Sequence, residues 1–341
     1  MFDTSHWKLR GPVKSMLSEL TDWDTDRKEW KPARFRQSVL FDADGRVLQL
    51  DQRGFNDSTH RQTYEYDPAG RLLLIRSGTL GEPPDHQMVF AYDAQGRLIR
   101  VVTVDPADVE RPSQTCSYDD HGRRTAVHDL APAPQGIAMS YAVDGSEFGY
   151  GAEGATRQTT TYDEYGRSVE SIFEDAAGEV IRRVFLTRDT AGRVVDEESQ
   201  AIAAFAVPES PDLSVEDRAT MQALMLQAFG SIKTSNQYDA AGHLMLQTRQ
   251  SGRLGETRTT YAYDERDNPI EQSEIDVQRG MNVDTDGTSH VTPDTTRIHD
   301  TRFAYVYDAH GNWTERSVSG RFSADGEFGP SNAERRAIEY W

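Results

Sequence analysis

The sequence predicts an all-β protein in which stacked hairpins form one curled antiparallel sheet. A turn-forming string recurs along most of the chain, and apolar and polar residues alternate around it. The mean hydropathy is -0.70 and hydrophobic residues make up 36% of the chain, which is typical of sheets that bury one face and leave the other in water. The 14 Tyr and 13 Phe residues indicate a folded chain rather than a disordered one.

The recurring string is an aromatic residue, Asp, two variable residues, Gly and Arg. Subtracting successive Asp positions gives steps of 25, 26, 26, 44, 26, 50, 25 and 44 residues, so most copies share one period. The Asp residues of the nine copies are Asp42, Asp67, Asp93, Asp119, Asp163, Asp189, Asp239, Asp264 and Asp308.

The string has the chemistry of a tight hairpin turn. In a type I turn, an Asp such as Asp67 bonds back to the backbone, and a Gly such as Gly70 supplies a positive φ. Pro68 stands second in its turn, where its fixed φ fits. Asp267 replaces Gly in one copy, and Asp tolerates a left-handed backbone better than most residues. We therefore expect hairpin turns that are followed by a G1 bulge.

Residues before each turn alternate with a period of two, as Gln62, Tyr64 and Tyr66 do. Two strands per repeat give roughly twenty strands, and strongly twisted open sheets rarely exceed about ten strands without curling. We therefore predict a spiral, a half-pipe or an imperfect barrel, with aromatic residues on the buried face.

The string resembles the YD repeat of the Rhs and teneurin-like family. The segments YDPAGRL, YDAQGRL and YDEYGRS match the family's YDxxGR pattern, and the resemblance covers residues 39–316. It implies a wrapped β-sheet, which forms a shell around a toxin in the large members. This chain is too short for such a shell and lacks the family's self-cleavage signature, so neither role is transferred. We treat 1–341 as a single YD-repeat domain of a small, free-standing bacterial type.

Two of the long steps contain predicted insertions. Residues 212–230 predict a helix near 214–229, with Ser214 as N-cap, Gly230 at its end and apolar residues at helical spacing. This helix either closes one end of the sheet or docks a partner through Met221 and Met225. Residues 279–296 predict a loop in which Asn282, Asp284 and Asp286 match the opening of a calcium loop.

The calcium match fails where the bidentate Glu should stand, because Pro293 occupies that position. We expect a solvated loop, with a weak cation site as the alternative, and no cofactor. The nine His residues show no metal-ligand spacing, and Cys116 is the single cysteine, so no internal disulfide can form. Nucleophile, zinc and phosphate-binding motifs are absent from the sequence. We predict no catalytic residues and a protein that is not an enzyme, with a hydrolase that uses carboxylates on one rim as an alternative.

The formal net charge of -19 opposes binding to nucleic acid or to an anionic membrane and favours a basic protein partner. The first residues do not resemble a signal peptide, so we expect a cytoplasmic protein. The leading hypothesis is a protein-binding, immunity-type protein that neutralises a secreted toxin or effector domain. A structural scaffold, or a shell-like relic of an Rhs protein, is the alternative. The candidate acidic contacts are Asp105, Asp108, Glu110, Asp196, Glu197, Glu198, Asp284 and Asp286.

Overall fold

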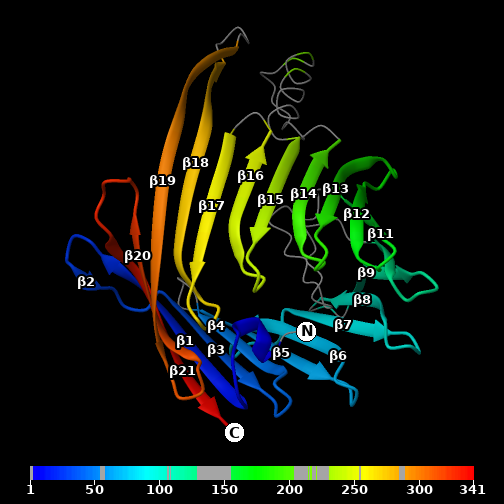
Figure 1. Cartoon of the computed structure of the whole chain (residues 1–341). Helices are drawn as coiled ribbons and strands as arrows, with labels where there is room; N and C mark the ends of the chain where they lie inside the picture. The colour runs from blue at the N-terminus through cyan, green and yellow to red at the C-terminus, as the bar shows by residue number, and fades with distance from the viewer. Residues whose placement is uncertain are drawn as a thin grey trace.

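A computed structural model of the chain describes residues 3–53, 58–105, 107, 109–128, 155–202, 214, 216, 220, 230–252, 255–283 and 289–341. For residues 111–113, 281–283 and 289–291 only the backbone is described. Figure 1 shows these residues as strands that follow one another around a ring.

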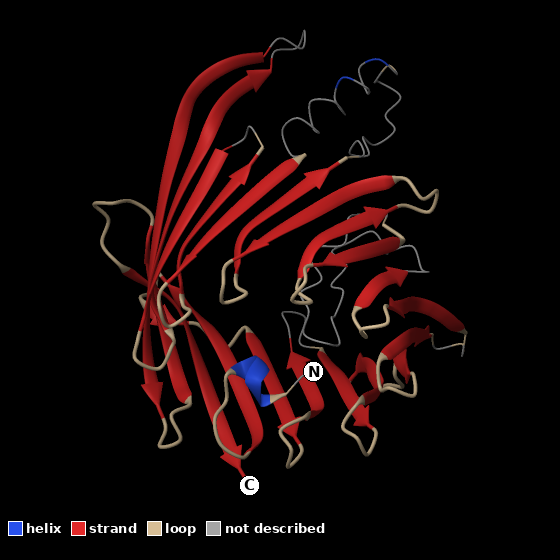
Figure 2. Cartoon of the chain, turned by 45° about the vertical axis from the view of Figure 1, so that its right-hand side comes forward, coloured by secondary structure: helices blue, strands red, loops and turns tan. Residues whose placement is uncertain are grey.

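The elements whose bounds are described are one short 3-10 helix and a succession of antiparallel strands, and Figure 2 colours helix blue and strand red. In chain order they are η1 (Thr4–Trp7), β1 (Val13–Asp24), β2 (Glu29–Trp30), β3 (Phe35–Phe41), β4 (Val47–Arg53), β5 (Thr59–Tyr66), β6 (Leu72–Thr79), β7 (His86–Tyr92), β8 (Leu98–Val104), β9 (Glu110–Tyr118), β10 (Arg124–His128), β11 (Arg157–Tyr162), β12 (Ser168–Glu174), β13 (Val180–Arg188), β14 (Val194–Ala201), β15 (Ser231–Tyr238), β16 (Leu244–Ser251), β17 (Gly255–Tyr263), β18 (Pro269–Val283), β19 (Ser289–Tyr307), β20 (Trp313–Arg321) and β21 (Gly329–Tyr340).

The sheet closes on itself. From β3 to β21 each strand pairs with the next, and β1 pairs with β21 from Val13↔Tyr340 to Asp22↔Asn332 and with β3 from Ser15↔Leu40 to Leu20↔Phe35. The result is a closed antiparallel barrel of 20 strands, to which β2 adds a short pairing at the end of β1. The prediction of a spiral or half-pipe is therefore wrong. The strands that close the ring, β1 and β21, lie outside the repeats from which the sheet was predicted.

The predicted helical insertion is also not part of the described fold. Apart from Ser214, Glu216, Thr220 and Gly230, residues 212–230 lie outside the described residues. Glu216 and Thr220 have a helical backbone, and η1 is the helical element whose bounds the described residues give. No helix of the described residues is long and apolar enough to cross a membrane.

The segment predicted as a loop, 279–296, is instead largely strand. Residues up to Val283 continue β18, residues from Ser289 begin β19, and the pairing runs from Glu271↔Arg302 to Val283↔Ser289. The Asp and Gly residues that suggested a loop lie at 284–288, outside the described residues. Hydrogen bonding between the two arms of the hairpin overrides their weak strand composition.

The main hydrophobic core lies where η1 meets β3 and its neighbours. Val39, Phe41 and Val47 are fully buried, and Trp7 packs edge-on against Phe41 with ring centroids 5.6 Å apart. Val39 and Phe41 lie on the face that also carries Tyr64, which we call the tyrosine face. Elsewhere the barrel is too wide for side chains to fill. Its 20 strands, spaced about 4.8 Å apart, give a circumference of roughly 96 Å. Side chains fill the interior of barrels of about eight strands.

Candidate functional site

The repeated turns have the geometry that their sequence predicts. At Asp67, the backbone carbonyl accepts the Gly70 N–H at 2.9 Å, and Oδ1 accepts the Arg71 N–H at 2.9 Å. The other carboxylate oxygen pairs with the Arg71 guanidinium at 2.6 Å. Gly70 has φ +82° and Asp67 donates its N–H to the Arg71 carbonyl at 2.9 Å, which is the geometry of a type I turn with a G1 bulge.

Each turn also contacts the next one along the rim. The Arg71 guanidinium lies 5.0 Å from the centre of the Tyr92 ring, and Tyr92 Oη donates to the Leu72 carbonyl at 2.8 Å. The same cation–π contact recurs in other copies, and the turns together form what we call the turn ring. Its other Arg–Tyr pairs are Arg46–Tyr66, Arg97–Tyr118, Arg123–Tyr162 and Arg193–Tyr238.

His243 stands where most copies have Arg. Its Nδ1 lies 2.9 Å from Asp239 Oδ2 and its Nε2 lies 2.8 Å from Asp267 Oδ1, so the imidazole bridges two consecutive turns. Hydrogen bonds that the protonated ring donates to Asp239 and then to Asp267 raise the pKa of His243 above its usual value. In the part of the chain that the structure describes, no group of three or more His, Cys, Asp or Glu side chains could hold a metal ion.

Asn312 closes the ring between the last turn and the N-terminal segment. Its side chain accepts the Arg10 N–H at 2.6 Å and donates to the Arg10 carbonyl at 2.8 Å and to Tyr340 Oη at 2.7 Å. Thr4 continues the ring by donating its N–H to the Gly45 carbonyl at 3.0 Å. The N-terminal segment therefore bridges the last and first turns.

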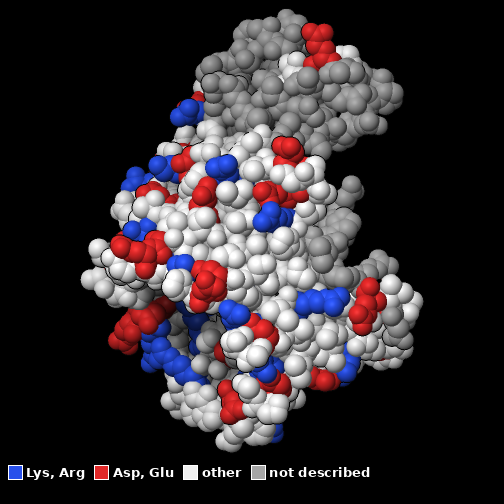
Figure 3. All heavy atoms as spheres, turned by 90° about the vertical axis from the view of Figure 1, so that its right-hand side faces the viewer, with Lys and Arg blue, Asp and Glu red and all other residues white. Residues whose placement is uncertain are grey.

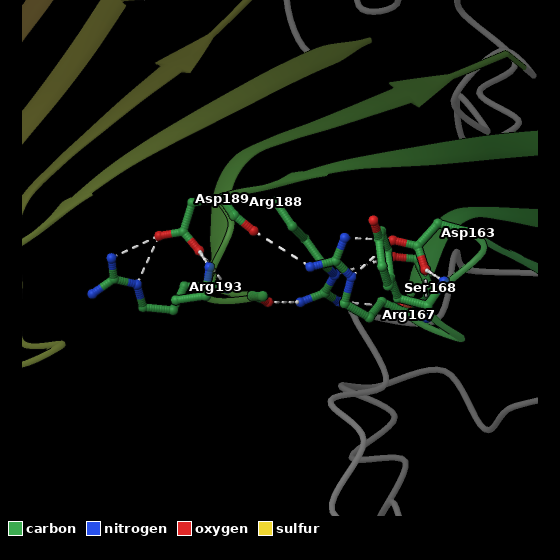
Figure 4. Close-up of polar contacts among 9 residues, drawn as sticks. Asp163, Arg167, Ser168, Arg188, Asp189 and Arg193 are labelled. Carbon is green, nitrogen blue, oxygen red and sulfur yellow. Dashed lines mark hydrogen bonds and ion pairs between the residues drawn. The ribbon is translucent and has the colours of Figure 1, made fainter.

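Arg188 takes the tyrosine position of its copy, directly before Asp189, and Figure 4 shows its side chain beside Ser168. Its Nε donates to the Ser168 carbonyl at 3.2 Å, which is the bond that a Tyr hydroxyl makes in other copies, and its Nη1 donates to the Gly192 carbonyl at 2.9 Å. The neighbouring Arg167 lies instead beside the ring of Tyr165, at 4.8 Å. The guanidinium thus reproduces the connection between turns without an aromatic ring.

The carboxylates on this rim are engaged by their own turns. Asp163 Oδ1 accepts two backbone N–H groups and Asp163 Oδ2 pairs with Arg167 at 2.7 Å, and the other Arg-containing copies repeat this pairing. Burial alone would raise the pKa of Asp163, but the hydrogen bonds from the backbone and guanidinium of Arg167 and from the Tyr165 N–H together outweigh it and lower this pKa. The turn ring is therefore explained by structural roles.

An exposed groove lies on the face of the barrel wall opposite the tyrosine face, beside the long hairpin of β18 and β19. It encloses about 590 Å³ and is lined by Trp30, Ile270 and Phe328, together with residues of β19 and β20. Trp30 and Ile270 are each 39% exposed, and Trp30 packs against Trp23 with ring centroids 5.1 Å apart. Exposed aromatic side chains around a concave surface are typical of protein-binding sites.

Two arginines frame the aromatic wall of this groove. Arg302 lies 4.0 Å and Arg321 lies 4.9 Å from the centre of the Phe328 ring. Arg302 also pairs with the exposed Glu271 at 3.3 Å, whereas Arg321 pairs with the buried Asp300 at 2.6 Å. A hydrogen bond from Ser273, and then the Arg321 charge, lower the pKa of Asp300. The groove therefore combines apolar surface with a solvent-accessible ion pair.

The predicted acidic contacts that the structure describes do not meet at one place. Asp105 forms the turn between β8 and β9 by accepting the N–H groups of Ala107 and Val109, and Glu110 begins β9. Asp196, Glu197 and Glu198 lie in β14, from which β10 to β13 separate them. Figure 3 shows acidic and basic side chains interspersed on the side that it views, rather than one acidic surface.

The remaining predicted contacts lie largely outside the described residues. These are Asp108, Met221, Met225, Asp284 and Asp286, while Asn282 is described only as backbone in β18, paired with His290. Sequence reasoning missed the groove residues Trp30, Ile270 and Phe328. Trp30 and Phe328 lie outside the repeats. The signal in the sequence was the nearness of Trp23 to Trp30, which the structure pairs across β1 and β2.

Comparisons with known proteins give weak similarities. No protein-family profile matches the chain, and no curated protein matches its sequence. A porin-like protein from Bacteroides uniformis is 10% identical, with a TM-score of 0.33 over 97% of this chain and 99% of that one. A crystal structure of TcdB2-TccC3 is 14% identical, with a TM-score of 0.18 over 96% of this chain and 25% of that one. This chain thus spans a quarter of the TcdB2-TccC3 chain.

Proposed function

We propose that this protein is a non-enzymatic protein-binding barrel of the YD-repeat type, and that its groove docks the partner. The observation that carries the proposal is the exposed aromatic and aliphatic wall of Trp30, Ile270 and Phe328. Aromatic residues and Arg supply most of the binding energy at protein interfaces, and the groove presents both. The recurrence of one turn chemistry around the rim supports assignment to YD-repeat proteins.

The partner that we propose is a basic protein, in the most specific version a toxin or effector domain that this chain neutralises in the cytoplasm. The net charge of -19 supports this choice, because a negative net charge accelerates association with a basic partner. Such association slows as salt screens the charges.

The test is a pull-down from the source bacterium at low and high salt, followed by affinity measurement with the purified partner. Trp30→Ala and Ile270→Ser should each weaken binding at least about tenfold, the equivalent of about 1.4 kcal/mol. Binding should also weaken as salt rises.

Ile99→Ser is the matched control. Ile99 occupies the same position after its turn as Ile270, and the two are 38% and 39% exposed, but Ile99 does not line the groove. Ile99→Ser should bind as wild type does. Equal losses in both variants, or a partner indifferent to salt and to the groove, would contradict the proposal. Capture of nothing at either salt would favour the structural scaffold.

A further inference from the structure

Part of one strand edge in the closed barrel has no neighbouring strand among the described residues. β19 runs from Ser289 to Tyr307, but β20 pairs with it only from Asp300, opposite Arg321, to Tyr307. Among the described strands, residues 289–299 therefore pair with β18 alone. Backbone N–H and C=O groups along such an edge remain available to another chain.

The usable part of this edge is Asp294–His299. Pro293 interrupts it on one side, because proline cannot donate a ladder hydrogen bond. On the other side β20 ends at Arg321, and the next residue, Phe322, is 80% exposed and stacks on His299 with ring centroids 4.7 Å apart. Six residues match the usual length of a strand. An added strand would continue β20 beyond the point where it leaves the sheet.

The side chains beside this edge favour an extended guest with β-branched residues. Ile298 lies opposite Ile275, which is 38% exposed, so an apolar guest residue beside Ile298 would bury surface that is now in water. Thr295 and Thr296 are exposed and suit β-branched neighbours across the strands. The groove lies close to this edge, on β18, β19 and β20. Arg302, which lines the groove, stands two residues past Asp300 in β19.

We infer that the Asp294–His299 edge of β19 binds an extended, cationic segment of the partner protein by β-strand addition. This inference rests on the proposed protein-binding function and specifies how one part of the partner is held. A second copy of this chain is a poorer occupant, because it would bring another -19 charges to the same edge. Main-chain hydrogen bonds would supply affinity, and the residues beside Ile298 would supply specificity.

The probe is a labelled, acetylated and amidated peptide, Lys-Lys-Val-Thr-Val-Thr-Val-Lys, whose binding to the full chain is followed by fluorescence anisotropy. We expect binding, and at least tenfold weaker binding when Glu replaces every Lys. Methylating the backbone nitrogens of either the Val or the Thr residues removes donors along one peptide edge. One of these two peptides should lose binding at least tenfold, because only one set faces β19.

Two proline variants test whether the peptide binds at the Asp294–His299 edge of β19. Successive residues of a strand direct their N–H groups to opposite sides, so Thr295→Pro and Thr296→Pro differ in which edge they affect. The variant that keeps the wild-type melting temperature is the one whose N–H faces the free edge, and it should bind the peptide at least tenfold more weakly. Unchanged peptide binding in that variant, or no binding to the wild-type protein, overturns the inference.

Ile270→Ser separates this inference from the proposed function. It removes an apolar residue of the groove but leaves the edge intact, so peptide binding should be retained while partner binding weakens. If the proline variant binds the partner normally and Ile270→Ser does not, the edge inference fails and the proposed function stands. If neither variant affects the partner, both fail.

Discussion

A repeat glycine is constrained by its backbone angle and also by the neighbouring turn. Gly96 has φ +80°, and a Cβ added to it would lie 3.2 Å from Nη1 of Arg71 in the preceding turn. Gly178 has φ +82° in a turn of the same chemistry, formed by Asp175, but a Cβ there would meet nothing within 4 Å. Substitutions at Gly96 and Gly178 therefore share the backbone strain, and only the one at Gly96 also disturbs packing against the neighbouring turn.

We expect Gly96→Ala to lower the melting temperature more than Gly178→Ala. Both variants carry the cost of a left-handed non-glycine residue, about 1–2 kcal/mol, but only Gly96→Ala also displaces the Arg71 side chain. Thermal unfolding followed by circular dichroism measures the difference. Equal losses in the two variants would show that contact between turns contributes nothing to stability.

His243 makes one joint of the turn ring sensitive to pH. The pKa of His243 is higher in the folded than in the unfolded protein. The bridge therefore contributes its full stability below the unfolded pKa, about 6.5. This contribution is lost as pH rises through the folded pKa. His243→Arg restores the residue of most other copies, which stays charged. The melting temperature of His243→Arg should therefore rise relative to that of the wild-type protein as pH increases from about 6 to 8. A melting-temperature difference between the variant and wild type that stays constant over this pH range would contradict a stabilising role for the His243 bridge.

At the scale of elements, the long hairpin depends on a close approach between its two strands. A Cβ on Gly280 would overlap Thr292 Oγ1 and the Pro293 carbonyl, at the register shift between β18 and β19. Gly280 also donates its N–H to Asp294 Oδ1 at 3.3 Å. This part of the hairpin extends past the pairing with β17, which ends at Gln278, and with β20.

Gly280→Ala should therefore loosen the outer half of the hairpin without unfolding the barrel. Hydrogen exchange of the amides in 279–283 and 289–292 should accelerate at least tenfold, while exchange in 300–307 stays unchanged. Gly320→Ala is the control, because its added Cβ would meet nothing closer than His299 Nε2 at 3.5 Å. Uniform acceleration along both strands would show that the hairpin opens as a single unit.

At the scale of the whole molecule, closure depends on a few contacts between the two ends of the chain. Asn312 is 2% exposed and joins the last turn to Arg10 and Tyr340 through three hydrogen bonds. In Asn312→Asp, the carboxylate could no longer donate to the Arg10 carbonyl, and it would lie close to Asp308 and Tyr340. Leaving a buried polar group unsatisfied costs about 1–3 kcal/mol, and more for a charged group.

We expect Asn312→Asp to lower the melting temperature and to increase hydrogen exchange at the β1–β21 pairing before other strands. Gln95→Glu is the control, because it makes the same change from amide to carboxylate at an exposed position in the turn at Asp93, away from the β1–β21 pairing. A variant at Asn312 that melts like the control would show that the ring is held closed by strand pairing alone.

Most of the local structure could be predicted from the sequence, because each turn is specified by a few neighbouring residues. The turn at Asp67 forms as expected, and so does its variant at Asp267, which has φ +65°. The roles of Arg71 and Tyr92 could not be predicted, since they concern contacts between successive turns. The groove was missed because Trp30 and Phe328 reach Ile270 only after distant strands pair.

The sequence by itself determined that this is an all-β chain of hairpins, with turns at the nine Asp positions, because turn chemistry and period-two alternation act over a few residues. Only the tertiary structure decided that the sheet closes into a barrel, that 279–296 extends a hairpin, and that a groove and a free edge lie on β18–β20. These features depend on pairings such as Val13 with Tyr340, between residues far apart in the chain. A local pattern carries no information about which distant strands will meet, so closure is decided by the geometry of the whole sheet.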